Sequence, residues 1–125
     1  MTEEQIALAR RAVACKGWRW MRGMSNDRGQ TIDCIDLMSG KAYCGEWDAD
    51  MTALPDLTDP ATLGCLLALV REAWKDVELY AAPVEYGWPD QVSPWWHVWD
   101  SSSEQHGPGA ATEAEALVAA LEAAP

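Results

Sequence analysis

The chain has 125 residues, the length of one ordinary domain, and we predict a single domain over residues 1–125. Hydrophobic residues make up 49% of the sequence and charged residues 23%, which excludes an intrinsically disordered chain. The net charge is −11, and the part after Lys75 contains nine acidic residues but no lysine or arginine. Because an acidic field repels phosphate groups, we expect no direct nucleic-acid binding and favour a protein partner with a basic surface.

The sequence contains no segment that is typical of a membrane protein. Its longest apolar run, residues 63–70, is too short to span a bilayer, and the first residues contain no apolar signal core. The four cysteines show no CxxC spacing. We therefore expect no membrane contact and a cytoplasmic protein with reduced cysteines.

Three segments have the capping residues and apolar spacing of helices. Thr2 and Gln5 form a capping box, and Ile6, Ala9 and Val13 follow on one face. A second capping box begins the last helix, with its hydroxyl at Thr112.

The second helix begins at Asp59 and Pro60, an acidic N-cap followed by proline at the first helical position. Its apolar residues lie on several faces, which predicts burial on several sides. Gly64 lies inside it, where glycine costs about 1 kcal/mol relative to alanine. We therefore expect close packing against a neighbour at Gly64.

Between the helices the apolar spacing changes to that of strands. Short strands are predicted over residues 18–21, 31–37, 77–81 and 95–100, with a further one over 41–44. The element order is then α-β-β-(β)-α-β-β-α. This order predicts an α+β fold, with three helices on a small antiparallel or mixed sheet of four to five strands.

The last predicted strand lies in the segment SPWWHVWD, residues 93–100. Alternation places Trp95, His97 and Trp99 on one face, and Trp96 and Val98 on the other. We expect Trp96 and Val98 to face the helices. The opposite face is either covered by the N-terminal helix, which makes His97 a packed core residue, or open, which makes it an interface.

Residues 83–94 form a long connection before this strand, with three prolines and a glycine. It displays two aromatic residues bordered by acids, as in a binding hot spot for a basic partner. The interaction candidates from this connection and the strand are Glu85, Tyr86, Trp88, Asp90, Trp95, His97 and Trp99. The alternative is that Tyr86 and Trp88 fold back onto the edge of the core.

The sequence contains no motif of an established catalytic or metal site. Asp48 and Asp50 resemble the start of a calcium loop, but Ala53 stands where that loop needs glycine and its bidentate glutamate is missing. The histidines and cysteines fit no zinc-ligand spacing, and neither a phosphate loop nor a G-x-S-x-G elbow is present. We expect no metal, no cofactor and no enzymatic activity, with a Cys–His nucleophile pair as the open alternative.

Three segments resemble a group of small proteins encoded by tailed phages and prophages of GC-rich bacteria. They are LPDLTDPATLGCLLALVREAW (54–74), ATEAEALVAALEAAP (111–125) and WRWMRGM (18–24). Proline usually stands in this group where this chain has Arg22. The resemblance implies a phage or mobile-element origin and the cytoplasm of an infected host cell, but no particular activity.

Two functions follow as hypotheses. The first is a small phage accessory protein that binds a macromolecular partner, in its sharpest form an inhibitor of host defence similar to the anti-CRISPR proteins. The second is a structural or assembly component that acts through oligomerisation, for which a homodimer is the simplest form.

Overall fold

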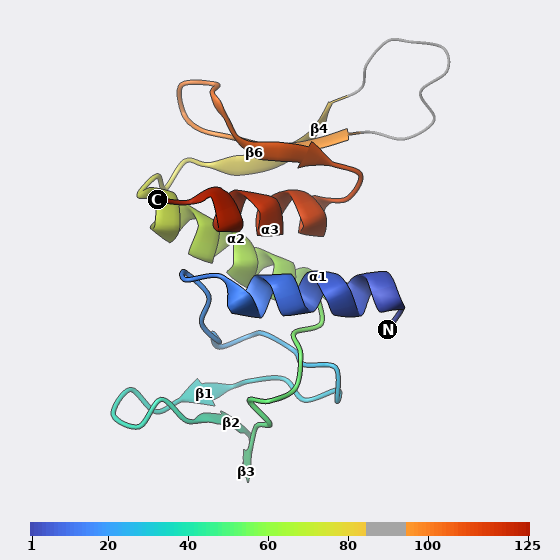
Figure 1. The fold of residues 1–125 in the computed structure, drawn as a ribbon. Helices are drawn as coiled ribbons and strands as arrows, with labels where there is room; N and C mark the ends of the chain where they lie inside the picture. The colour runs from blue at the N-terminus through green and yellow to red at the C-terminus, as the bar shows by residue number, and fades with distance from the viewer. Residues whose placement is uncertain (85–94) are drawn as a thin grey trace. The chain divides into compact units, whose positions relative to one another are not determined.

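The structure is a computed structural model that describes residues 1–84 and 95–125. Its contacts divide into two compact units. One unit comprises Met1–Ala14 and Trp18–Cys65, and the other comprises Cys15–Gly17 and Leu66–Pro125. Helix α2 (Pro60–Trp74) contributes residues to both units (Figure 1). The α+β class is confirmed, since three helices occur with antiparallel sheets.

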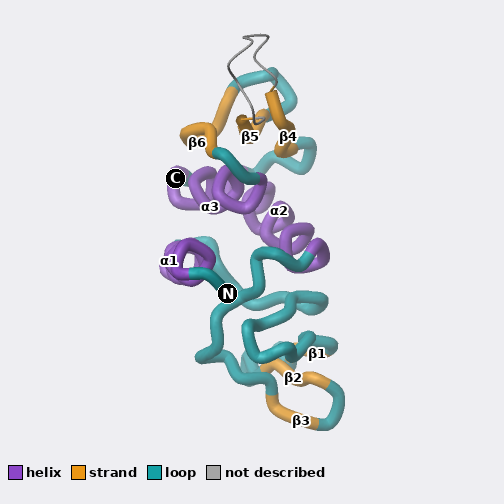
Figure 2. Tube along the Cα trace, turned by 90° about the vertical axis from the view of Figure 1, so that its right-hand side faces the viewer, coloured by secondary structure: helices purple, strands orange, loops and turns teal. Residues whose placement is uncertain are grey.

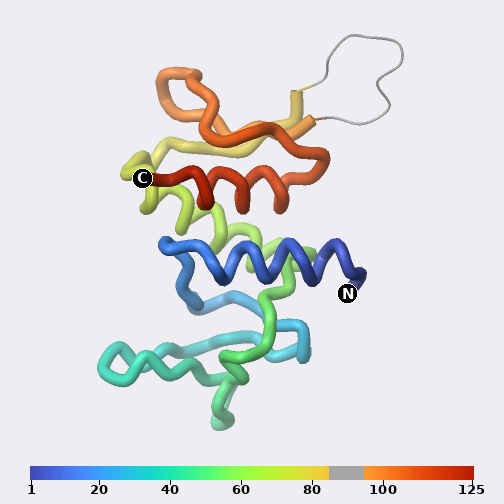
Figure 3. Tube along the Cα trace, viewed as in Figure 1, coloured from blue at the N-terminus to red at the C-terminus, as the bar shows by residue number. Residues whose placement is uncertain are grey.

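The first unit contains helix α1 (Glu3–Ala14) and a small antiparallel sheet in the order β1-β2-β3. The strands are β1 (Cys34–Ile35), β2 (Ala42–Cys44) and β3 (Trp47–Asp48). The chain doubles back between β1 and β2 in a tight turn, which the trace shows clearly (Figure 3). The largest fully buried side chain of this unit is Met24.

The capping box that begins α1 is confirmed: the Gln5 amide N–H donates to Thr2 Oγ1, and the Thr2 N–H donates to Gln5 Oε1. The prediction that Ile6, Ala9 and Val13 form the buried face of this helix is wrong for Val13. Ala12 is buried instead, and Val13 is exposed. The buried face is therefore built from small residues, which carry a weaker hydrophobic signal than valine.

The strand predicted over residues 18–21 is absent: these residues have no strand pairing in the structure. Trp18 and Trp20 instead stack edge to face, with ring centroids 5.6 Å apart. The chain then turns at Gly23, which has φ of +99° and donates its N–H to the Ile32 carbonyl. The tryptophans whose spacing suggested a strand pack on each other instead of on a neighbouring strand.

Helix α2 begins where its cap predicts, because Asp59 Oδ2 accepts hydrogen bonds from both the backbone N–H and the hydroxyl of Thr62. Leu66, Leu69 and Val70 are at most 1% exposed, so one face of the helix is deeply buried. The expected close packing at Gly64 is wrong. This glycine is exposed, and a Cβ built there meets no atom of the described residues within 4 Å.

The second unit contains a three-stranded antiparallel sheet in the order β4-β5-β6 and the helix α3 (Glu113–Ala123). The strands are β4 (Tyr80–Val84), β5 (Trp95–Trp99) and β6 (Gln105–Ala110). Helix α3 contacts all three strands from one side, and the second half of α2 lies on that same side (Figure 2). Six consecutive residues of α3, Ala116 to Leu121, are buried.

In residues 1–84 and 95–125, two sheets of three strands replace the single sheet of four to five strands that the sequence predicts. Strand β3 was not predicted because it is only two residues long. Strand β6 was not predicted because its sequence, QHGPGA, contains glycine and proline, which are rare in strands. The strand predicted over residues 77–81 begins later, at Tyr80. The Asp76 side chain accepts the Glu78 N–H and holds residues 76–79 in a turn.

Candidate binding surface

Strand β5 is the centre of the second sheet, and its two faces have different surroundings. Val98 lies opposite His106 of β6, and the His106 ring stacks on Trp74 of α2 at 4.1 Å between centroids. Directly opposite residues of an antiparallel pair share a face, so Val98 faces the helices. Val98 is 1% exposed, as expected, whereas Trp96 on the same face is half-buried.

The other face of the sheet carries four aromatic side chains. Trp95, His97 and Trp99 alternate onto it from β5, and Tyr80 joins them because it pairs with Trp99. We name Tyr80, Trp95, His97 and Trp99 the outer face. Neither α3 nor the second half of α2 packs on it, since both lie against the opposite side of the sheet (Figure 2).

The outer face is partly open and partly packed. Tyr80 is 44% exposed and Trp95 is 40% exposed, whereas His97 between the two tryptophans is only 7% exposed. The rings of His97 and Trp99 are 5.5 Å apart and tilted by 53°. Each of the two alternatives drawn from the sequence therefore holds for part of this face: His97 is packed, while the aromatic surface of Tyr80 and Trp95 stays accessible.

A bulge in β6 shapes this face. Trp96 pairs with Ala110 and Val98 pairs with His106, so Gly107, Pro108 and Gly109 lie opposite the single residue His97. Gly107 has φ of +73°, and its missing side chain lets β6 approach α3, since a Cβ there would be 3.1 Å from the Ala120 Cα. At Gly109 a Cβ would be 2.5 Å from His97 Cε1. The two glycines therefore permit close packing on opposite sides of the sheet.

The hairpin between β5 and β6 is fixed by one carboxylate. Asp100 accepts the backbone N–H groups of Ser102 and Glu104 and lies 3.1 Å from His106 Nε2. The hydrogen bond from the Glu104 N–H is the main cause that holds the pKa of Asp100 below its ordinary value. The Trp74 indole, on which His106 stacks, donates its N–H to the Ala120 carbonyl. Trp99 therefore directly precedes a residue that is fixed by several hydrogen bonds.

Both edges of the sheet carry features that disfavour pairing with a further strand. Pro83 in β4 has no N–H to donate, and the bulge interrupts the ladder of β6. The Gln105 side chain also donates to the Gly107 carbonyl along that edge. Both edges are therefore poor templates for a further strand.

Acidic residues surround the end of the sheet where Tyr80 pairs with Trp99. We name them the acidic rim: Asp76, Glu78, Asp100 and Glu104. The Ser101 N–H donates to Asp76 Oδ2 at 3.3 Å, which places Asp76 beside the hairpin that contains Asp100 and Glu104. Glu78 and Glu104 are exposed. Two basic residues lie close to them in the chain: Lys75 directly precedes Asp76, and Arg71 donates its Nε–H to the Leu79 carbonyl.

The predicted site residues divide into two sets. Glu85, Tyr86, Trp88 and Asp90 lie outside the described residues, so their contribution stays a prediction. Trp95, His97 and Trp99 come together on the outer face. Sequence reasoning missed Tyr80, because its pairing with Trp99 depends on strand register, and it also missed the glycine-proline-glycine bulge. The glycine-proline-glycine tripeptide was the sequence signal from which this bulge could have been predicted.

The residues considered for metal binding do not converge in the described parts of the chain. No group of three or more His, Cys, Asp or Glu side chains is arranged there to hold a metal ion. His97 and His106 lie on opposite faces of the sheet. Asp50 pairs with Arg28 at 2.9 Å, and Asp59 caps α2.

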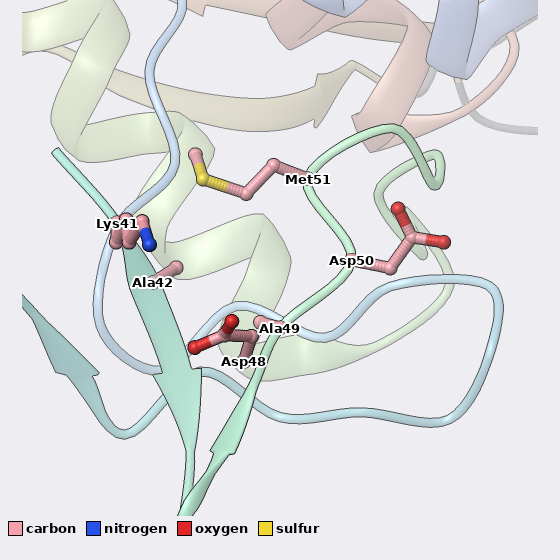
Figure 4. Close-up of a pocket in the computed structure, with 6 residues that line it drawn as sticks. All are labelled: Lys41, Ala42, Asp48, Ala49, Asp50 and Met51. Atoms are coloured by element: carbon pink, nitrogen blue, oxygen red, sulfur yellow. The ribbon is translucent and has the colours of Figure 1, made fainter.

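The first unit offers an open cavity of about 220 Å³ beside β2 and β3 (Figure 4). Its lining combines apolar side chains with three charged ones, and consists of Lys41, Ala42, Asp48, Ala49, Asp50 and Met51. Hydrogen bonds from the hydroxyl and the backbone N–H of Thr52 are the main causes that lower the pKa of Asp50. Because Thr52 and Arg28 already bind this carboxylate, Asp50 has little capacity left for a ligand.

Comparison with protein-family models, with curated protein sequences and with solved structures finds no match to this chain. Within the described parts of the chain, no helix has the length and apolar character needed to cross a membrane.

Proposed function

We propose that the protein acts by binding a protein partner with a basic surface, and that the outer face of the β4-β5-β6 sheet is the binding surface. The observation that carries this proposal is the exposure of Tyr80 and Trp95 on a sheet face opposite the helices. Large aromatic residues are the commonest anchors of protein interfaces, and they lose little conformational entropy when they are buried.

The charge around the outer face supports the nature of the partner. The chain after Lys75 contributes acids but no lysine or arginine, and four of these acids form the acidic rim. An acidic surface attracts a basic partner and speeds association, whereas it repels nucleic acid. We propose on the same ground that the protein has no direct contact with nucleic acid.

The biological setting rests on the resemblance of residues 54–74 and 111–125 to the phage-encoded group. We propose a phage or prophage accessory protein that acts in the cytoplasm of the host cell by binding rather than by catalysis. Inhibition of a host defence system is the sharpest form of this proposal, since many such inhibitors are small and acidic.

Affinity capture from a lysate of a GC-rich bacterium tests the proposal. Tagged wild type is compared with Tyr80→Ala/Trp95→Ala, with Tyr86→Ala/Trp88→Ala, and with the control Trp47→Ala, which removes a 76% exposed tryptophan of the first unit. We expect the first double variant to lose proteins that wild type and control retain. If all variants recover the same proteins, the outer face is not the binding surface.

Light scattering on the purified protein tests the alternative of a structural component that acts through oligomerisation. If the wild type forms a concentration-dependent dimer and Tyr80→Ala/Trp95→Ala abolishes it, the outer face is a homodimer interface instead.

A further inference from the structure

We infer that the outer face recognises arginine side chains of its partner, and that the guanidinium group stacks over the Tyr80–Trp99 pair within reach of the acidic rim. This inference rests on the proposed function and adds the chemistry that the surface selects.

The first observation is the pairing of two aromatic rings at the end of the sheet. Tyr80 and Trp99 are directly opposite on adjacent antiparallel strands, which places their Cβ atoms about 5 Å apart on one face. Tyr80 is 44% exposed and Trp99 is half-buried, so aromatic surface is available at this position. The faces of such rings carry partial negative charge and attract cations.

The second observation is that hydrogen bonds order the backbone on either side of this pair. His97 packs against Trp99, and Asp100 immediately after it fixes the β5–β6 hairpin through two backbone N–H groups. Tyr80 follows a turn that the Asp76 carboxylate stabilises. A platform that is already ordered loses little entropy when a ligand binds to it.

The third observation is the charge at the same end of the sheet. Exposed Glu78 precedes Tyr80 by two residues, and exposed Glu104 lies in the hairpin that follows Trp99. Asp100 and Asp76 are already engaged with backbone N–H groups and His106. Glu78, the exposed acid nearest to Tyr80 in the chain, is therefore the carboxylate we assign to a cation that lies over the rings.

Arginine fits this combination better than lysine. Its planar guanidinium stacks on an aromatic ring and still donates hydrogen bonds in the ring plane to a carboxylate. Lysine is a strongly hydrated point charge that gains less from stacking. The surface should therefore prefer arginine, whereas a surface that is only acidic would bind both residues alike.

Fluorescein-labelled octa-arginine and octa-lysine peptides test the preference, with binding followed by fluorescence anisotropy at low salt. Variants are wild type, Tyr80→Leu/Trp99→Leu and the control Trp47→Leu, whose indole is exposed between Glu46 and Asp48 in the first unit. Leucine keeps apolar bulk but removes the ring, and circular dichroism establishes that each variant is folded.

We expect octa-arginine to bind wild type at least about threefold more tightly than octa-lysine. This preference should disappear in Tyr80→Leu/Trp99→Leu and persist in Trp47→Leu. Equal affinity of wild type for the two peptides, absence of binding to both, or an unchanged preference in the double variant would overturn the inference. The proposed function fails separately, because it is measured by capture of a folded partner rather than by peptide binding.

Discussion

Gly109 is the residue on which the packing of the outer face depends most sharply, and its replacement by alanine gives a prediction with a calculable cause. A Cβ at this position would lie 2.1 Å from Trp95 Nε1 and 2.5 Å from His97 Cε1. An ordinary contact between such atoms needs about 3.5 Å or more, so both rings have to move by an ångström or more. The backbone of Gly109 is not in the left-handed region, so the whole cost is steric.

The expected magnitude follows from which ring can move. Trp95 is 40% exposed and can swing outward, whereas His97 is 7% exposed and has packed neighbours. Overpacking at such a site destabilises a protein by about 1–3 kcal/mol. We therefore expect Gly109→Ala to lower the free energy of unfolding by this amount and to displace the Trp95 indole.

Gly64→Ala is the matched control, because the same chemical change occurs inside α2, where a Cβ meets no described atom within 4 Å. Alanine should raise the free energy of unfolding by about 0.5–1 kcal/mol through its better helix propensity. Urea unfolding followed by circular dichroism measures both variants, and the indole N–H resonances in a nitrogen-15 correlation spectrum report on Trp95. If Gly109→Ala is as stable as wild type with an unmoved Trp95 resonance, the packing of the outer face described here is wrong.

Three further predictions concern the caps, the carboxylates and the thiols. Thr112→Ala removes the oxygen that accepts the Glu115 N–H at the start of α3, and should cost about 1 kcal/mol of unfolding free energy in urea titrations. The pKa values of Asp36, Asp50 and Asp100 lie below the ordinary 3.8, so their stabilisation is present at neutral pH and is lost as the pH falls through their folded-state pKa values. The urea midpoint should fall between about pH 5 and pH 2, and fall less in Asp100→Asn; an equal fall would show that Asp100 contributes nothing. Exposed Cys34 should react with iodoacetamide before Cys65, because burial, followed by the charge of Asp59, raises the pKa of the Cys65 thiol. Mass spectrometry of timed samples gives the order, and earlier labelling of Cys65 would contradict it.

Local sequence signals predicted the beginnings of the helices well. The caps at Thr2, Asp59 and Thr112 all accept the expected backbone N–H groups. A capping residue acts on the next turn of its own chain, so its effect can be read from neighbouring residues alone. The alternation in residues 95–99 is local in the same way, and it placed Trp95, His97 and Trp99 on one face.

Features that depend on distant residues could not be predicted from the same signals. The pairing of Tyr80 with Trp99 requires the register of β4 and β5, which are separated by residues 85–94. Strand β6 contains two glycines and a proline, and it forms because Gly107 packs on α3 and Gly109 packs under Trp95 and His97. The number of sheets depends on such pairings, and for this reason one sheet was predicted where the described parts of the chain form two.

Exposed apolar residues of the first unit also escaped the sequence reasoning. Leu37 and Met38 are 95% and 97% exposed at the turn between β1 and β2. The Asp36 carboxylate orders this turn by accepting the Met38 N–H and the Ser39 hydroxyl. Nothing in the local sequence distinguishes these residues from a strand end, because leucine and methionine suit both.

Site-specific photo-cross-linking tests the central claim, that the outer face binds a protein partner, most directly. The photoreactive residue is introduced as Tyr80→p-benzoylphenylalanine on the outer face, and as Ala123→p-benzoylphenylalanine at the exposed end of α3 on the other side of the sheet. After irradiation in the bacterial lysate, we expect a discrete protein adduct from position 80 and none from position 123. Adducts from position 123 alone, the same adducts from both positions, or none from position 80 would contradict the claim.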